Sequence, residues 1–170
     1  CRTAHVIRHL QESPGYDILW ANEAVSHIHP AEDFFKAAYR GLRPGGVLII
    51  ADANALNPVA RWRASRIRGG RNWYVHRQTV PQCAAPLDEV AEERLFSSLA
   101  LPGMLRSEGF RVRRLDMHGF LGSFFLPQAW QFIPLVGRAT ACFQNAARRL
   151  PGIRRLGSSM TVIAEKSGGS

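Results

Sequence analysis

The sequence predicts an α/β fold in which strands and helices alternate along the chain. Two apolar runs, at residues 16–21 and 47–51, have the length and composition of buried strands. An amphipathic helix over residues 30–42 separates them, and a Pro-Gly-Gly turn ends it. Strand, helix, tight turn and strand make a βαβ unit, which indicates a parallel sheet layered with helices.

Each of these first elements has a local justification. The Ser-Pro-Gly turn at residues 13–15 leads into the first strand. Glu32 and Asp33 lie near the start of the helix and Arg40 near its end, as the helix dipole favours. The run at 47–51 is rich in β-branched residues, as in parallel strands covered on both faces. The apolar helix residues share one face: Phe34, Phe35, Ala38, Tyr39 and Leu42.

The second half repeats the alternation less regularly. Residues 88–109 are predicted to be helical, with a break near Pro102 and Gly103 and an end at Gly109. The whole length of 170 residues fits one domain. Three more elements are predicted: a half-exposed strand at 110–117, a helix at 135–150 and a strand at 160–165.

The chain is basic, with a formal net charge of +9. Twenty of its 22 basic residues are arginines, and carboxylates are absent between Asp52 and Asp88 and between Met117 and Ala164. Such tracts can face a phosphate, a nucleic acid or an anionic lipid surface, or they can be solvated faces of an arginine-rich protein. The total charge favours the solvated face, whereas the arginine cluster at 61–77 fits both alternatives.

Cysteine usage and hydropathy predict a cytoplasmic protein. The longest stretch without charge, residues 119–137, contains prolines and glutamines and does not resemble a membrane-spanning helix. A disulfide framework or a thiolate zinc site is not expected, because the cysteines are odd in number and far apart, at Cys1, Cys83 and Cys142.

Residues 16–28 and 31–58 resemble the second half of class I S-adenosylmethionine-dependent methyltransferases. The first stretch is YDILWANEAVSHI, with an aromatic-Asp start and a His-Ile end. The second contains the turn RGLRPGG at residues 40–46, and Gly109-Phe110 matches the end of a later helix. The resemblance extends from about residue 5 to 166. It implies a Rossmann-like three-layer sandwich, with a mostly parallel sheet and an antiparallel last strand.

The sequence departs from this family at its start. It contains no G-x-G turn, and residues 4–10 resemble the third strand and its exit. We therefore expect residues 1–170 to form one partial domain, from strand three to strand seven, whose fourth strand is an exposed apolar edge. A variable substrate-side region is expected at about 55–100 and a helical excursion at about 120–157. The resemblance offers His9 or Gln11 for the adenine contact.

The resemblance places Ala21, Asn22 and Glu23 beside the methionine and ribose portions of S-adenosylmethionine. These residues follow a strand, and the carboxyl ends of parallel strands form the ligand crevice of α/β sheets. Alternatively, Asn22 and Glu23 cap the next helical turn.

His27 is the predicted catalytic base, because imidazole titrates near neutral pH and the family's corresponding position faces the cleft. Alternatively, His27 packs structurally. His29 is expected only to start the helix after Pro30. The two histidines lack a third ligand, so no metal site is predicted.

Five residues are predicted to contact the acceptor. Asp52 and Asn54 follow the second strand, although they could equally be turn formers. Trp73, Tyr74 and His76 lie among the arginines of 61–77, an arrangement that suits a phosphorylated, sugar-nucleotide or nucleic-acid acceptor. The same residues could form an amphipathic helix with its tryptophans in the core.

The predicted function is methyl transfer to a small-molecule, glycan or lipid-linked acceptor. The alternative is a non-catalytic Rossmann-like module that binds nucleic acid or anionic lipid through its arginines. Residues 124–156 combine apolar and arginine residues, so peripheral contact with an anionic membrane is a further hypothesis. A helix packed on the sheet, or a dimer contact, would explain the same pattern.

Overall fold

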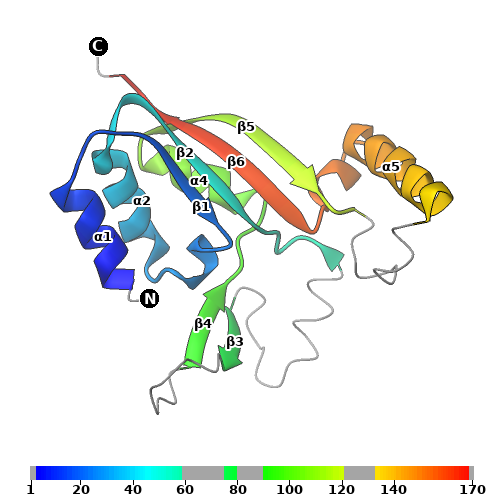
Figure 1. The fold of residues 1–170 in the computed structure, drawn as a ribbon, viewed down its shortest axis with the longest axis horizontal. Coiled ribbons are helices and arrows are strands. Elements are labelled where there is room, and N and C mark those ends of the chain that lie inside the picture. The colour runs from blue at the N-terminus through cyan, green and yellow to red at the C-terminus, as the bar shows by residue number, and fades with distance from the viewer. Residues whose placement is uncertain (1–2, 59–74, 80–89, 121–132, 169–170) are drawn as a thin grey trace.

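The computed structural model describes residues 3–58, 75–79, 90–120 and 133–168. Its described helices and strands alternate along the chain, as the sequence predicts (Figure 1). In chain order they are α1 (Thr3–Glu12), β1 (Tyr16–Asn22), η1 (Val25–His27), α2 (Ala31–Gly41), β2 (Leu42–Ala53), β3 (Val75–Thr79), β4 (Val90–Arg94), α4 (Ala100–Ser107), β5 (Phe110–His118), α5 (Pro134–Arg149), η3 (Ile153–Arg155) and β6 (Ser159–Lys166).

Four of the strands form one mixed sheet in the order β1-β2-β6-β5. β1 and β2 are parallel, and β6 runs antiparallel to both of its neighbours. The α/β class and the antiparallel last strand are therefore confirmed. β3 and β4 pair antiparallel in a separate two-stranded sheet (Figure 1).

The core lies on one face of the four-stranded sheet. Leu48 and Ile50 of β2 alternate with less buried neighbours, and Val162 and Ala164 of β6 lie on the same side. Residues of three helices complete this cluster, so α1, α2 and α4 cover the same face. Their buried apolar side chains include Leu10, Phe34, Phe35, Leu101 and Leu105.

The opposite face is less covered, especially at the edge strand β1. Ile18 is 61% exposed and Trp20 is 74% exposed, although both are large apolar residues. Within the described residues, β1 pairs only with β2. The exposed apolar edge that the sequence predicts is therefore present, and two of the three expected layers are visible.

The predicted βαβ unit is confirmed, with small differences at its ends. α2 begins after Pro30 and buries six of its eleven residues. β2 begins at Leu42, before the Pro-Gly-Gly turn, and a register shift against β1 accommodates the turn. Gly45 has a φ of +76°, and a Cβ on Gly46 would lie 2.9 Å from the Tyr16 carbonyl oxygen. These two positions therefore require glycine.

Three predictions about secondary structure are wrong. Residues 4–10 lie in helix α1 and not in a strand, because the spacing of Ile7 and Leu10 places both against the core at helical period. Residues 90–94 form strand β4, whereas a helix was predicted from residue 88. α4 also continues through Pro102, which lies in the first turn, where a backbone N–H needs no helical partner.

Candidate functional site

The candidate site lies where the parallel strands β1 and β2 end side by side. Asn22 pairs with Ala51 in the sheet register. Glu23, which follows β1, and Asp52, which is the next residue of β2, therefore lie near each other at the carboxyl ends of these two strands. The carboxyl ends of the strands are where α/β sheets bind their ligands.

Asp52 connects the ends of the two strands through hydrogen bonds. Its side chain is buried, its Oδ2 accepts a hydrogen bond from the Ser26 backbone N–H at 3.0 Å, and its Oδ1 accepts one from Ala53 N–H at 2.8 Å. Burial raises the pKa of the Asp52 carboxyl, and the hydrogen bonds from Ala53 and Ser26 oppose that rise. Asp52 therefore holds the loop after β1 against the end of β2.

The residues after β1 present polar groups to solvent. Asn22 and Glu23 are exposed, whereas Ala21 is buried in the core. Glu23 has a φ of +47°, a left-handed conformation that costs free energy in a non-glycine residue, and its N–H donates to the Ala51 oxygen at 2.7 Å. The backbone is thus held in an unfavourable conformation next to two accessible polar side chains, a feature that often marks a functional site.

His27 is exposed at the end of η1, so the packing alternative does not describe it. Its backbone N–H donates to the Ala24 oxygen at 3.1 Å. A positive charge on its ring would lower the pKa of Asp52. His29 is exposed and precedes the helix, as predicted.

Asn54 has a structural environment. Its side chain is fully buried. The Asn54 Nδ2 donates hydrogen bonds to the carbonyl oxygens of Arg155 and Gly157, both at 2.8 Å. The Asn54 Oδ1 accepts hydrogen bonds from the backbone N–H groups of Leu56 and Ser98, both at 3.1 Å. This environment favours the turn-forming alternative over acceptor binding. The sequence could not reveal it, because three of the four partners lie 44 to 103 residues away.

The remaining predicted acceptor contacts cannot be placed against the site. Trp73 and Tyr74 lie outside the described residues, and His76 belongs to strand β3. The link from β4 to α4 does reach the site, through a backbone bridge between Asn54 and Phe96.

The last residue of β4, at the start of this link, is an arginine that the sequence analysis did not single out. Arg94 pairs with Glu32 at 3.1 Å and lies 5.4 Å from the centre of the Phe96 ring. The pKa of Glu32 is lowered by a hydrogen bond from its own backbone and by Arg94. Beside them is a small cavity of about 230 Å³, lined by Arg94, Leu95, Phe96, Ser97, Ala100 and Met104.

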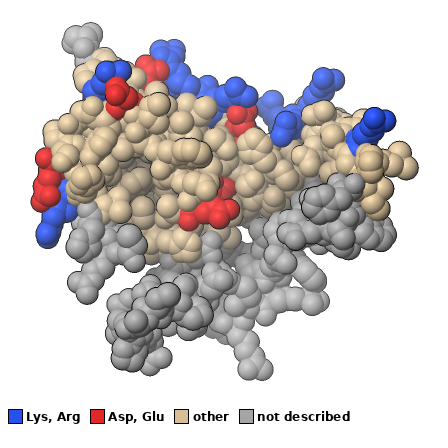
Figure 2. Space-filling view, in the orientation of Figure 1, with Lys and Arg blue, Asp and Glu red and all other residues tan. Residues whose placement is uncertain are grey.

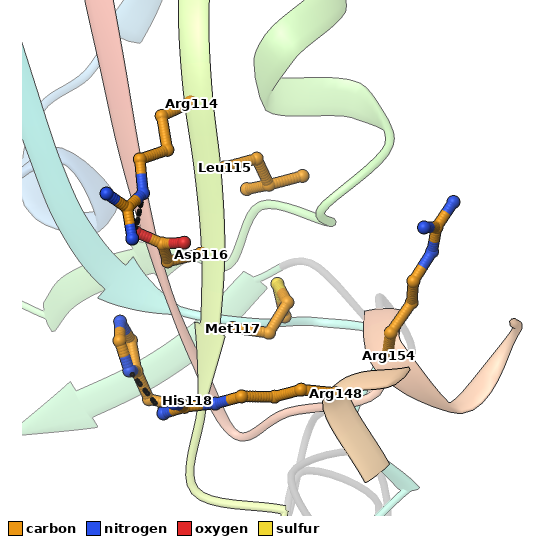
Figure 3. Close-up of a pocket in the computed structure, with 7 residues that line it drawn as sticks. All are labelled: Arg114, Leu115, Asp116, Met117, His118, Arg148 and Arg154. Carbon is orange, nitrogen blue, oxygen red and sulfur yellow. Dashed lines mark hydrogen bonds and ion pairs between the residues drawn. The ribbon is translucent and has the colours of Figure 1, made fainter. Parts of the chain in front are cut away.

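A second cavity, of about 300 Å³, lies beside the carboxyl end of β5 and contains no predicted site residue (Figure 3). Arg114 pairs with Asp116 at 2.6 Å, while Arg148 reaches from α5 to His118, 3.3 Å away. Arg154 enters the lining from η3 without an ion pair to any described residue. This cavity is therefore positively charged.

Two further kinds of site were sought in the described parts of the chain. No group of three His, Cys, Asp or Glu side chains there could hold a metal ion. No described helix combines the length and apolar character needed to cross a membrane.

Comparison with known proteins identifies the fold. No protein-family model and no curated protein matches the sequence. A possible histamine N-methyltransferase from Thermotoga maritima matches 91% of this chain at 16% identity, with a TM-score of 0.58. A putative S-adenosylmethionine-dependent methyltransferase from Listeria monocytogenes matches 95% at 12% identity, with a TM-score of 0.56. The [4+2]-cyclase SpnF matches 92% at 17% identity, with a TM-score of 0.50.

The chain spans only part of these proteins: 57% of the Thermotoga chain, 66% of the Listeria chain and 52% of SpnF. At such low identities the likeness concerns the backbone arrangement, and a cyclase among the matches shows that this arrangement serves more than one reaction. The chain has the fold of class I S-adenosylmethionine-dependent methyltransferases.

Proposed function

We propose that the protein transfers a methyl group from S-adenosylmethionine to a small-molecule, glycan or lipid-linked acceptor. The observation that supports this proposal best is the pair of exposed polar residues, Asn22 and Glu23, at the carboxyl end of β1 in a methyltransferase-like fold. The strained backbone at Glu23 adds to it, because such conformations cluster at ligand sites.

The residues present fit the methionine and ribose portions of the cofactor. The Asn22 amide can donate and accept hydrogen bonds, and the Glu23 carboxylate can accept them from hydroxyl or ammonium groups. Ala21, the third residue predicted at the cofactor, is buried in the core, so the proposed side-chain contacts come from Asn22 and Glu23. The bound cofactor supplies an activated methyl group on a sulfonium, and the chain has to position the acceptor and exclude water.

His27 is the proposed base for an acceptor hydroxyl. Its exposed imidazole can take a proton from such a group. Asp52 would act indirectly, since its carboxylate holds the backbone of neighbouring Ser26. Asp52 is thus proposed to position His27, and its predicted contact with the acceptor gives way to this role.

The test is the affinity of the complete protein for S-adenosylhomocysteine, measured by isothermal titration calorimetry. Asn22→Ala and Glu23→Gln should each weaken binding by about 10- to 100-fold, because each removes a hydrogen bond, or the charge assisting one, at the ligand. Glu12→Gln is the matched control, since Glu12 is exposed and precedes the opposite end of β1. Wild-type affinity in both site variants, or no binding by the wild type, would refute this assignment.

A further inference from the structure

Residues 133–155, which contain helix α5 and the following 3-10 helix η3, are here called the α5–η3 arm. This arm packs little against the rest of the described chain. Of the 16 residues in α5, only Ala147 is buried. Figure 1 shows α5 beyond the ends of β5 and β6, away from the helices that cover the core. The core packing that stabilises most helices in folded proteins is therefore largely missing here.

One side of the arm is apolar and faces solvent. The apolar residues of this stripe recur at helical spacing, and all of them are exposed. Leu135 is 77% exposed, Phe143 47% and Leu150 49%. The large exposed apolar side chains of the whole described chain gather here more than anywhere else. The stripe consists of Leu135, Ala139, Cys142, Phe143, Ala146 and Leu150.

The arm is also strongly basic. It contains five arginines and no acidic residue, and all five are exposed. Among the described residues none of them forms an ion pair with a carboxylate. Figure 2 shows basic side chains and no acidic ones over the part of the surface that α5 forms. The arginines are Arg138, Arg148, Arg149, Arg154 and Arg155.

The base of the arm is nevertheless fixed to the sheet. The Asn54 Nδ2 donates hydrogen bonds to the carbonyl oxygens of Arg155 and Gly157. The Asn57 Nδ2 donates one to the Leu156 carbonyl oxygen at 2.7 Å. Arg148 contacts His118 at the end of β5. The arm is therefore held beside the carboxyl ends of the strands, with its stripe directed away from the core.

We propose that the α5–η3 arm binds an anionic membrane surface, with the apolar stripe inserted at the boundary between headgroups and acyl chains. Five exposed arginines, none of them ion-paired with a described carboxylate, complement lipid phosphates. An exposed apolar stripe beside such arginines is how an amphipathic helix lies in a membrane interface. The positively charged cavity at the base, lined by Arg148 and Arg154, offers a place for one headgroup (Figure 3).

Two other occupants fit less well. A second copy of the chain docked on the stripe would bring two basic arms together, and like charges brought close cost free energy. A nucleic acid would pair with the arginines but would leave Leu135 and Phe143 without an apolar partner. An anionic membrane satisfies both features, and this inference does not depend on methyl transfer.

The test is sedimentation of the complete protein with lipid vesicles. Binding to vesicles that contain phosphatidylglycerol should exceed binding to pure phosphatidylcholine, and it should weaken between about 0.1 M and about 0.5 M salt. Arg138→Gln together with Arg149→Gln should lower the partition coefficient about 10- to 30-fold. Leu135→Ser together with Phe143→Ser should lower it by at least about tenfold.

Matched controls lie elsewhere on the described surface. Arg106→Gln with Arg111→Gln removes two exposed arginines, and Trp20→Ala removes an exposed aromatic side chain of β1. Both controls should bind like the wild type. Circular dichroism checks that each variant is folded, which is expected because every changed residue is exposed.

Several results would overturn the proposal. These are no binding to anionic vesicles at low salt, equal binding to neutral vesicles, or wild-type binding by both arm variants. A dimer in sedimentation velocity that the Leu135 and Phe143 changes abolish, without vesicle binding, would assign the stripe to a second copy. Binding to single-stranded RNA without vesicle binding would assign the arginines to nucleic acid.

A fluorescent probe gives an independent readout. Cys142 lies within the stripe, so a polarity-sensitive dye attached there should shift its emission to the blue on anionic vesicles, in a background where Cys1 and Cys83 are serine. An unchanged spectrum on vesicles that sediment the protein would show that the stripe is not inserted, and would overturn the proposed orientation.

Discussion

Helices α2 and α5 are both amphipathic, but the molecule uses them in opposite ways. α2 buries six of its eleven residues, including Phe34 and Phe35, against the sheet. α5 is longer, yet it buries only Ala147 and leaves Phe143 nearly half-exposed. The pattern of apolar residues thus specifies that a helix has an apolar face. Its position in the fold specifies what covers that face.

The largest expected difference concerns one phenylalanine in each helix. Phe35→Ala should lower the free energy of unfolding by about 3–5 kcal/mol, because the ring is fully buried and its removal leaves a cavity. Phe143→Ala should lower it by less than about 1 kcal/mol, because that ring already contacts solvent. Urea unfolding followed by circular dichroism measures both. Equal losses would mean that the α5 stripe is covered in solution.

A second prediction extends the comparison from apolar to charged side chains. Asp52→Ala should cost about 1–3 kcal/mol, since it leaves the buried Ser26 N–H without its acceptor. Asp116→Ala removes only an ion pair with the exposed Arg114 from a partly exposed position, and should cost less than about 1 kcal/mol. The same urea experiment measures both losses, and a larger cost for Asp116→Ala would contradict the structural role of Asp52.

The pH dependence of stability should have opposite signs at two carboxyl groups. Burial raises the pKa of Asp52 above 3.8, so the folded state binds this proton more tightly. Its contribution to stability therefore falls as pH rises from the unfolded-state pKa to the folded-state pKa. A hydrogen bond from Arg113 lowers the pKa of Glu165 below 4.5, so its contribution is present above that value and is lost as pH falls through the folded-state pKa.

These signs are measured by urea unfolding of the wild type, Asp52→Asn and Glu165→Gln from about pH 3 to pH 7. The stability of the wild type minus that of Asp52→Asn should fall with rising pH. The stability of the wild type minus that of Glu165→Gln should rise with rising pH. Matching signs in the two series would show that one of the two pKa directions is wrong.

The sequence predicts the βαβ unit well because its signals are local. The apolar run of β1, the spacing of Phe34, Phe35 and Ala38, and the turn at Gly45 and Gly46 each lie within one element or beside it. Residues 4–10 illustrate the limit of resemblance. A family pattern suggested a strand, whereas the helical spacing of Ile7 and Leu10 was the better guide.

The candidate site is only partly visible in the sequence, because its geometry depends on contacts between distant residues. The position of Asp52 near the end of a strand was predictable, although β2 extends past it to Ala53. Its bond to Ser26 was not predictable, because it joins residues 26 positions apart. The sequence suggests that Asn54 is an accessible polar residue, because its hydrogen-bond partner Gly157 lies 103 residues away. The left-handed conformation of Glu23 has no sequence signal, since glutamate does not favour it.

The smallest expected effect concerns Arg148, the side chain that links α5 to the sheet. An arginine only donates, so His118 Nδ1 accepts, and the neutral ring carries its proton on Nε2, 3.3 Å from Thr161 Oγ1. Arg148→Met should change the free energy of unfolding by less than about 0.5 kcal/mol, because the contact is exposed. It should nevertheless speed amide hydrogen exchange in α5 and shift the ring nitrogen resonances of His118.

Arg149→Met is the matched control, because Arg149 is the next residue of α5, is equally exposed and has no side-chain partner among the described residues. It should leave the His118 resonances and the exchange rates of α5 unchanged. If both variants behave alike, the link through His118 does not hold the helix. Ala147 and the contacts of η3 would then fix α5 to the sheet. The difference from α2 would be greater still, because the hydrogen bond from Arg148 to His118 of β5 would not stabilise the position of α5.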